Sequence, residues 1–313
     1  MPPAAIPPAL RDEILAVSPA MFRRVADFIT REIGIKMTSA KLPLLQSRLQ
    51  RRVRDLGCGT LEDYLELVVT DRAGEGERQQ FVDAVTTNKT DFLREPQHFD
   101  FLTQKALPSL DPGGTAVRSR GLGGAGIASE PVRGSAPAVV PTWRVNLWSA
   151  GCSTGQEIYT LAMVLSEFGA QRGAFDFSLL GTDISSRVLQ QAQTAIYDEE
   201  LVEPVPIAWR QKYLLRSRHP GRAEVRIVPE LRRRARFQPL NFMDASYPVG
   251  EIFDVIFFRN VMIYFDKPTQ QAVVARMCER LRPGGYLFIG HSESLAGLKL
   301  PLQTLGPAIY RRL

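Results

Sequence analysis

A glycine-bracketed turn is the part of this sequence whose residue types are best suited to chemistry. The turn Gly151-Cys152-Ser153-Thr154-Gly155 follows an apolar run, and Glu157 lies in the first turn of the helical pattern that comes next. Glycines let a bulky ligand approach the backbone, beside a helix N-terminus. A second apolar run, 175–181, ends in Thr182-Asp183, which places a carboxylate where a ribose diol is usually held.

Two further polar positions follow apolar segments later in the chain. Asn260 and Val261 come just after the run 253–258, at the carboxyl edge where ligands of open sheets bind. Asn241 and Phe242 follow Pro239-Leu240, where an ordinary loop turn is the alternative. Asparagine can both donate to and accept from a purine edge. We expect Asn260 and Val261 to face the same ligand as the glycine turn.

The elements that must position these residues change character along the chain. Apolar residues recur at helical spacing through 18–83, whereas strand and helix patterns alternate from Arg144, which favours a parallel sheet. Glycine and proline dominate 111–141, so we expect a flexible loop there. The expected divisions are a flexible N-terminus (1–17), a helical domain (18–83), a connector (84–110), the glycine- and proline-rich insertion (111–141) and an α/β domain (142–313).

Several short elements are expected within these divisions. A helix should form at 97–106, within the connector, and the last strands should be 286–290, 302–305 and 308–312. Three short strand-like runs, at 213–215, 225–228 and 235–237, indicate a small antiparallel insertion at about 209–237. The fold class is therefore α/β, a doubly wound and mostly parallel sheet with a small antiparallel β insertion, preceded by an all-α domain.

Composition limits the class of protein. The 313 residues are 44% hydrophobic and 23% charged, as in a globular protein, and no apolar run approaches the length of a membrane span. Three scattered cysteines and no secretion signal favour a cytoplasmic setting. The net charge of +6 favours acidic partners without indicating nucleic acid. The three histidines lack ligand spacing, so no metal site is expected.

Four segments in order resemble the chemotaxis receptor methyltransferase family (CheR-type). They are Thr87 to Glu95, Trp148 to Glu157, Phe258 to Asp266 and Gly290 to Ser294. The resemblance covers nearly the whole chain and departs from compact members only in the 111–141 insertion. It implies a Rossmann-like methyltransferase sheet, S-adenosyl-L-methionine as cofactor with S-adenosyl-L-homocysteine as product, and a monomer whose partners are methyl-accepting chemotaxis receptors.

The resemblance also implies roles for particular residues. It places Asn88, Thr90 and Arg94 over the cofactor, with the 84–110 connector contributing to the site. Arginine can hold a carboxylate by a two-pronged contact, so Arg94 would bind either the cofactor's carboxylate or the substrate's. Tyr264 would line the methyl-transfer pocket and bind the incoming carboxylate. The implied cofactor-binding residues are Asn88, Thr90, Arg94, Gly151, Gly155, Glu157, Asp183, Asn241, Phe242, Asn260 and Val261, and the implied catalytic residues are Arg94 and Tyr264.

Each assignment has a structural alternative. Asp183 could cap the helix that starts near Ser185, and Glu157 could only stabilise a helix dipole. Thr90 could be an N-cap and Arg94 part of a surface ion pair. Tyr264 could be a packed aromatic residue. Cys152 is expected to be a small packed residue, because a catalytic thiol needs a basic neighbour.

The helical pattern 41–56 has two faces. Its apolar face is Leu42, Leu45, Leu49, Val53 and Leu56, and Arg48, Arg51 and Arg54 lie opposite. A charged outer face is commonly just solvated. The alternative is that the three arginines dock against an acidic receptor helix near the methylation sites.

The expected function is that of a protein-glutamate O-methyltransferase. It would esterify receptor glutamates by in-line methyl transfer and so tune receptor signalling. A glutamate is already ionised near pH 7, so positioning replaces a general base. The alternatives are a nucleic-acid methyltransferase, against which stands the lack of a basic and aromatic strip, and a non-catalytic module that senses the cofactor.

Overall fold

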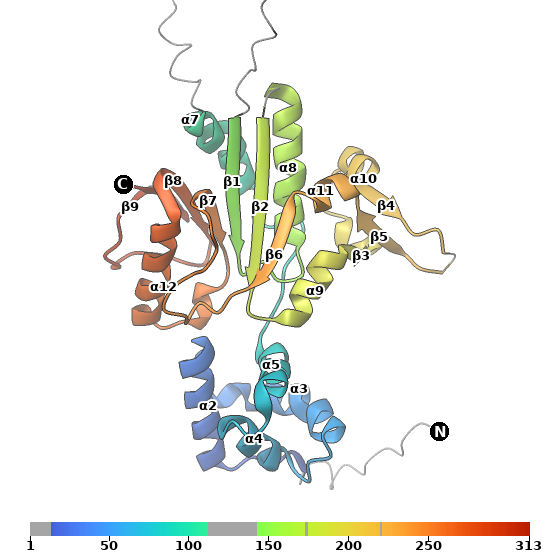
Figure 1. The fold of residues 1–313 in the computed structure, drawn as a ribbon, viewed down its shortest axis with the longest axis vertical. Coiled ribbons are helices and arrows are strands. Elements are labelled where there is room, and N and C mark those ends of the chain that lie inside the picture. Colours follow the sequence, from blue (N-terminus) through green and yellow to red (C-terminus); the bar gives the residue numbers. More distant parts are fainter. Residues whose placement is uncertain (1–13, 112–142, 173–174, 220) are drawn as a thin grey trace, which may run out of the picture.

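The computed structural model describes residues 14–111, 143–172, 175–219 and 221–313 (Figure 1). The flexible N-terminus expected at 1–17 is described only from residue 14, and the insertion expected at 111–141 lies outside the described residues except for Asp111. In the described part of the chain, no helix combines the length and apolarity needed to cross a membrane.

The N-terminal domain is all helical. It contains α2 (Pro19–Ile33), η1 (Ser39–Lys41), α3 (Leu42–Asp55), α4 (Leu61–Val69) and α5 (Gly74–Val85). Ser18 caps α2, and Thr60 with Asp63 forms a capping box that starts α4. Val25, Leu49 and Tyr64 are fully buried in one core. Leu56 was expected on the apolar face of α3, but it is exposed because the helix ends at Asp55.

The connector leads into a helical segment that covers one face of the sheet. This segment is continuous through α6 (Gln97–Phe101), the π-helical turn η2 (Leu102–Ala106) and α7 (Leu107–Leu110). Phe99 stacks on Phe257 of the sheet with ring centroids 5.9 Å apart. Phe101 contacts Phe288 edge-on. The connector is thereby fixed at its C-terminal end against the sheet.

The second domain is built on a seven-stranded sheet in the order β6-β2-β1-β7-β8-β10-β9. The first five of these strands are parallel to one another, and β10 and β9 run antiparallel at one edge. The strands are β1 (Trp143–Ala150), β2 (Phe175–Asp183), β6 (Ala235–Pro239), β7 (Phe253–Phe258), β8 (Leu281–Ile289), β9 (Leu302–Gly306) and β10 (Ile309–Arg312). The doubly wound, mostly parallel fold is therefore confirmed.

Helices cover both faces of this sheet. They are α8 (Gln156–Arg172), α9 (Ser186–Thr194) and α12 (Lys267–Arg280). Leu147 of β1 packs in the same core as Leu161 of α8. The next residue, Trp148, packs on the other face in the same core as Met277 of α12. Because the chain passes from β1 to β2 on one side and β7 pairs on the other, β1 marks the switch point where ligands of such sheets bind.

A small antiparallel sheet stands beside the main one, in the order β3-β5-β4. Its strands are β3 (Ile196–Asp198), β4 (Leu214–Arg216) and β5 (Glu224–Ile227), with η4 (Glu199–Val202), α10 (Ile207–Tyr213) and α11 (Pro229–Arg232) around them. The predicted membership was partly wrong. Residues 235–237 belong to β6, which pairs in parallel with β2, and the third strand comes from β3 upstream. Short apolar runs do not encode which sheet they join.

Candidate active site

A cavity of about 320 Å³ lies at the carboxyl ends of β1, β2 and β7, between the two domains. Ile33 and Ile35 close it from the helical domain. With the exception of Gly155, every predicted catalytic or cofactor residue lines this cavity. These residues are Asn88, Thr90, Arg94, Gly151, Glu157, Asp183, Asn241, Phe242, Asn260, Val261 and Tyr264.

Asp183 presents an ordered carboxylate at the end of β2. It is 7% exposed, and its two oxygens accept hydrogen bonds from the backbone N–H groups of Ser153 (2.9 Å) and Ser185 (3.0 Å). Burial raises the pKa of Asp183, and these N–H donors oppose that rise. The Ser185 hydroxyl, accepting from Val188 N–H, caps α9. The four lone pairs of this carboxylate outnumber its backbone donors, so Asp183 keeps acceptor capacity for a ligand.

The two loop glycines have different roles. Gly151 has φ of 81°, and a Cβ there would lie 2.6 Å from Cγ2 of Val261, inside the cavity wall. Gly155, at φ 95°, would place a Cβ 2.8 Å from the Tyr197 hydroxyl and 3.0 Å from the Ala192 side chain. Gly155 does not line the cavity, because the loop packs there on α9 and β3, and its contact with the cofactor stays a prediction. Cys152 between them is buried.

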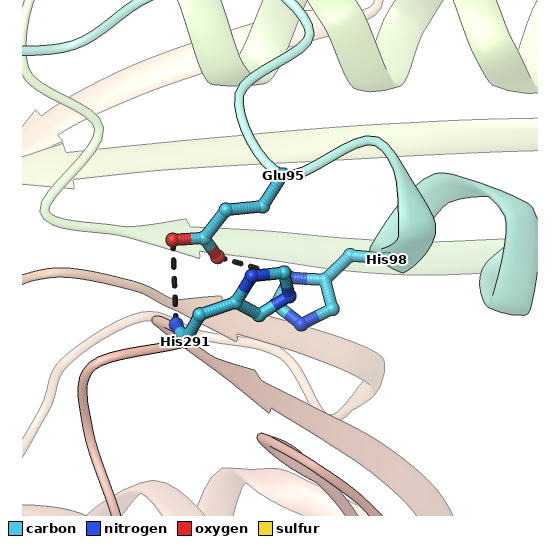
Figure 2. A group of neighbouring side chains, drawn as sticks. All are labelled: Glu95, His98 and His291. Carbon is cyan, nitrogen blue, oxygen red and sulfur yellow. Dashed lines mark hydrogen bonds and ion pairs between the residues drawn. The ribbon is translucent and has the colours of Figure 1, made fainter.

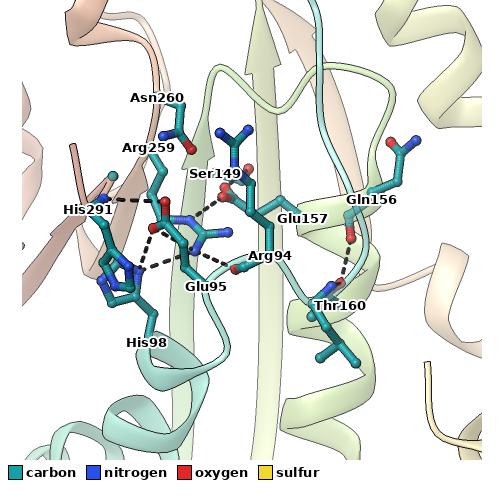
Figure 3. Close-up of polar contacts among 12 residues, drawn as sticks. Arg94, Glu95, His98, Ser149, Gln156, Glu157, Thr160, Arg259, Asn260 and His291 are labelled. Atoms are coloured by element: carbon teal, nitrogen blue, oxygen red, sulfur yellow. Dashed lines mark hydrogen bonds and ion pairs between the residues drawn. The ribbon is translucent and has the colours of Figure 1, made fainter. Parts of the chain in front are cut away.

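A buried arginine that sequence reasoning missed organises the floor of the cavity (Figure 3). The Arg259 side chain is 2% exposed, and its Nε donates to Glu157 Oε2 at 2.7 Å. Ser149 Oγ donates to the other Glu157 oxygen at 2.6 Å. Arg259 Nη1 also donates to the backbone oxygen of Arg94 at 2.8 Å. Glu157 is therefore half of a buried ion pair as well as part of the cavity lining, a role beyond stabilising the dipole of α8.

The connector is attached to the site at several points. Asn88 donates from Nδ2 to Thr86 Oγ1 (3.3 Å), and its backbone oxygen accepts from Ser153 Oγ (2.8 Å). The Arg94 side chain donates to the backbone oxygen of Lys89 at 3.3 Å. In the described ranges Arg94 forms no ion pair with a carboxylate, and α6 starts after Pro96, so neither structural alternative for Thr90 and Arg94 matches the geometry. The Arg94 guanidinium remains available to a ligand.

Tyr264 lines the cavity within electrostatic reach of Arg94 and Arg48. Burial raises the pKa of its phenol, while the charges of Arg94 and Arg48 lower it by less. The hydroxyl is thus protonated near neutral pH and able to donate. The backbone oxygen of Tyr264 accepts from the N–H of Lys36 at 3.0 Å, which fixes this residue to the helical domain.

A second missed residue, Glu293, holds the Asn260 segment. Its Oε2 accepts the backbone N–H groups of Gly290 (2.6 Å) and Asn260 (2.9 Å), and its Oε1 accepts that of Ile263 (3.3 Å). Asn260 has φ of 61°, and a Cβ on Gly290 would lie 2.4 Å from Asn260 Nδ2. The shape of this turn therefore depends on one buried carboxylate. The signal in the sequence was a lone acid after Gly290-His291-Ser292.

Asn241 and Phe242 line the cavity from the loop after β6. Asn241 Nδ2 donates to the backbone oxygen of Glu32 at 2.7 Å, and its Oδ1 accepts the N–H of Met243 at 3.0 Å. Any adenine contact must therefore use the second N–H or the remaining lone pair of this amide. The Phe242 ring packs edge-on against Phe258, with centroids 5.1 Å apart.

Two of the histidines come together with Glu95, although their spacing in the sequence shows no metal motif (Figure 2). One ligand atom from each of Glu95, His98 and His291 lies within 4.8 Å of the others. However, Arg259 Nη1 is 3.2 Å from His98 Nδ1 and 3.4 Å from Glu95 Oε2. The charged guanidinium of Arg259 thus already contacts one possible ligand atom of His98 and one of Glu95, where its positive charge would repel a metal cation.

The arginines of α3 are not equivalent. Arg48 was expected on the outer face, but its Nη1 donates to the backbone oxygens of Val85 (3.0 Å) and Thr86 (2.9 Å), because its long side chain reaches back across the end of α5. Arg51 has an 83% exposed side chain and lies 3.6 Å from Asp55. Arg54 is exposed. Arg48 is therefore partly structural, and Arg51 and Arg54 face solvent.

Comparison with known proteins agrees with this architecture. Residues 20–86 match the CheR methyltransferase all-alpha domain, and residues 132–310 match the CheR methyltransferase SAM binding domain. The chain is 35% identical to a chemotaxis protein methyltransferase of Klebsiella aerogenes over 95% of this chain and 90% of that protein. It is 34% identical to the Escherichia coli chemotaxis protein methyltransferase, over 95% and 92%. The chain therefore belongs to the CheR methyltransferase family, and its α/β domain is an S-adenosylmethionine-binding domain.

Proposed function

We propose that this protein methylates side-chain carboxylates of glutamates in methyl-accepting chemotaxis receptors. The observation that carries the proposal is that Asp183, Arg94 and Tyr264 line one cavity. Asp183, which is suited to bind the cofactor, thus shares one cavity with Arg94 and Tyr264, which are suited to bind the acceptor carboxylate. The names of the relatives, chemotaxis protein methyltransferase, support the same choice of substrate class.

The cavity fits the cofactor by its chemistry. Asp183 keeps lone pairs for a ribose diol, and Phe242, Val261 and Ile33 provide apolar walls for a base. Glu157 is a buried carboxylate suited to an amino group, and Arg259 and Ser149 orient it by hydrogen bonds to its two oxygens. When bound, S-adenosylmethionine supplies a methyl group on a positively charged sulfur.

The acceptor side needs positioning rather than a base. A glutamate is ionised near pH 7, so its oxygen is already nucleophilic. The protonated Tyr264 hydroxyl can donate to one carboxylate oxygen, and the Arg94 guanidinium can hold the other. Because the acceptor's negative charge disappears during transfer, very strong binding of that charge would slow the reaction. A single hydroxyl and one partly exposed arginine suit this requirement.

A labelling experiment tests the proposal. The protein is incubated with methyl-labelled S-adenosylmethionine and either membranes carrying a chemotaxis receptor or total RNA. We expect label in the receptor that alkali releases as methanol, since a glutamyl methyl ester is alkali-labile. Label in RNA alone would replace this proposal by a nucleic-acid methyltransferase. Binding of S-adenosylhomocysteine without turnover on any receptor would favour a cofactor-sensing module.

A further inference from the structure

A second hollow, here called the basic groove, adjoins the active-site cavity. It has a volume of about 520 Å³ and lies between α3, the end of α5 and the start of α9. Thr86 and Asn88 line both the cavity and the groove, so the two spaces are neighbours. Its charged lining residues are Arg48, Arg51, Arg52, Asp83 and Arg187.

The charges in the groove are unbalanced. Arg52 is neutralised by Glu77 and Asp55. Asp83 is buried, and its oxygens accept from Gln79 Nε2 (3.0 Å) and Ser186 Oγ (2.9 Å). Neither Arg48 nor Arg187 forms an ion pair with a carboxylate in the described residues: Arg48 donates only to uncharged oxygens. The groove therefore presents excess positive charge.

The positive charge of Arg187 lies where its electrostatic interactions are unfavourable. It is exposed in the first turn of α9, where the helix dipole disfavours a cation. It also faces Arg48: burial is the main cause that lowers the pKa of Arg48, and the charge of Arg187 lowers it further. An arginine that is unfavourable for its own helix and for its neighbour is best explained by an anionic ligand that relieves both.

The two walls of the groove are held in fixed relation. Gln79 of α5 donates to the backbone oxygen of Ile184 at 2.9 Å, and Ser186 of α9 donates to Asp83 of α5. Figure 1 shows α9 at the lower edge of the sheet, next to the helical domain. The helices that carry Arg187 and Arg51 are thus fixed on opposite walls of the groove.

We propose that this basic groove binds an acidic segment of the receptor beside the glutamate to be methylated, and that Arg187 on α9 is a docking residue of the α/β domain. The inference rests on the proposed function and adds a contact from the domain that binds the cofactor. Carboxylates of the segment would lie between Arg187 and the arginines of α3, while the target glutamate enters the adjoining cavity. Electrostatic complementarity of this kind sets association rate and specificity more than turnover.

The test compares two charge reversals in the full-length protein. Arg187→Glu should raise the KM for receptor-bearing membranes about tenfold, and Arg187→Ala about threefold, with kcat and the affinity for S-adenosylhomocysteine unchanged. Arg233→Glu is the matched control, because Arg233 is exposed at the end of α11, outside the groove. Arg187→Lys should restore a near-normal KM. Raising the salt concentration should raise the KM for receptor more in the wild type than in Arg187→Glu, because salt screens the charge that the variant has already lost.

Two outcomes would overturn the inference, and they are distinct from failure of the proposed function. The docking role is rejected when Arg187→Glu shifts the receptor KM no more than Arg233→Glu does, while the wild type still forms the alkali-labile ester. It is also rejected when Arg187→Glu loses affinity for S-adenosylhomocysteine by the same factor as for receptor. A wild type that labels no receptor rejects the proposed function itself.

Discussion

Asp183 at the end of β2 and Arg94 in the connector line the same cavity, although they come from segments far apart in the sequence. Asp183 is fixed by two backbone N–H groups, whereas the Arg94 side chain makes a single 3.3 Å hydrogen bond. One residue is thus rigid and buried, and the other is held mainly by its backbone. This difference predicts different responses to mutation.

Replacing Arg94 by alanine should separate activity from stability. We expect turnover with receptor to fall about 100-fold, because a donor to the acceptor carboxylate is lost. The melting temperature should change little, since only the contact to Lys89 disappears. Arg94→Lys keeps the charge without the two-pronged geometry and should recover only part of the activity. Parallel losses of activity and stability would contradict a catalytic role.

Asp183→Asn should weaken cofactor binding selectively. The amide keeps the size of the side chain, but its NH₂ group would face the backbone N–H of Ser153 or Ser185, which needs an acceptor. The substitution also removes the negative charge that favours hydrogen bonds from a diol. We expect the Kd for S-adenosylhomocysteine, measured by calorimetry, to rise at least about tenfold. Asp198→Asn, at the exposed end of β3, is the control. Unchanged affinity in Asp183→Asn would remove this residue from the cofactor site.

Glu293→Gln tests whether one carboxylate sets the Asn260 turn. The glutamine amide cannot accept three backbone N–H groups as the carboxylate does. Affinity for S-adenosylhomocysteine should fall about tenfold, and Asn260→Ala should add little to that loss, because both changes act through the same turn. Glu279→Gln, exposed on α12, should have no effect. Additive losses in the double variant would show that the two residues act independently.

His98 should make the stability of the protein depend on pH. Burial, with a smaller contribution from Arg259, lowers the pKa of His98 from 6.5 to about 4. Between these values the unfolded chain binds more protons, so the free energy of unfolding rises with pH and reaches its full value above about 6.5. The contribution is about 3 kcal/mol. Denaturant unfolding of wild type and His98→Gln from pH 4 to 7 measures it, and parallel curves would contradict it.

Much of the cavity lining could be predicted from polar residues that directly follow apolar, strand-like runs in the sequence. Asp183 and Asn260 follow buried apolar runs, and the parallel topology brings such ends together. The helical domain and the sheet strands at 175–183 and 253–258 are likewise readable from periodicity. These features depend on local pattern, which the sequence carries directly.

Other parts of the site depend on contacts that no local pattern encodes. Arg259 is buried only because Glu157, Glu95 and the Arg94 carbonyl come from separate segments. Arg48 lies on the outer face by helical arithmetic, yet its side chain reaches the last turn of α5. Gly155 fits the glycine pattern of a cofactor loop, but it packs against Tyr197 and Ala192 and does not line the cavity.

The Lys36–Tyr264 and Asn241–Glu32 hydrogen bonds join the two domains around the cavity. Because both domains contribute walls to the cavity, a bound ligand contacts both domains at once. Its binding free energy then stabilises the folded arrangement of the two domains together. Heating the loaded protein should melt both halves in one transition, at a higher temperature than the ligand-free protein.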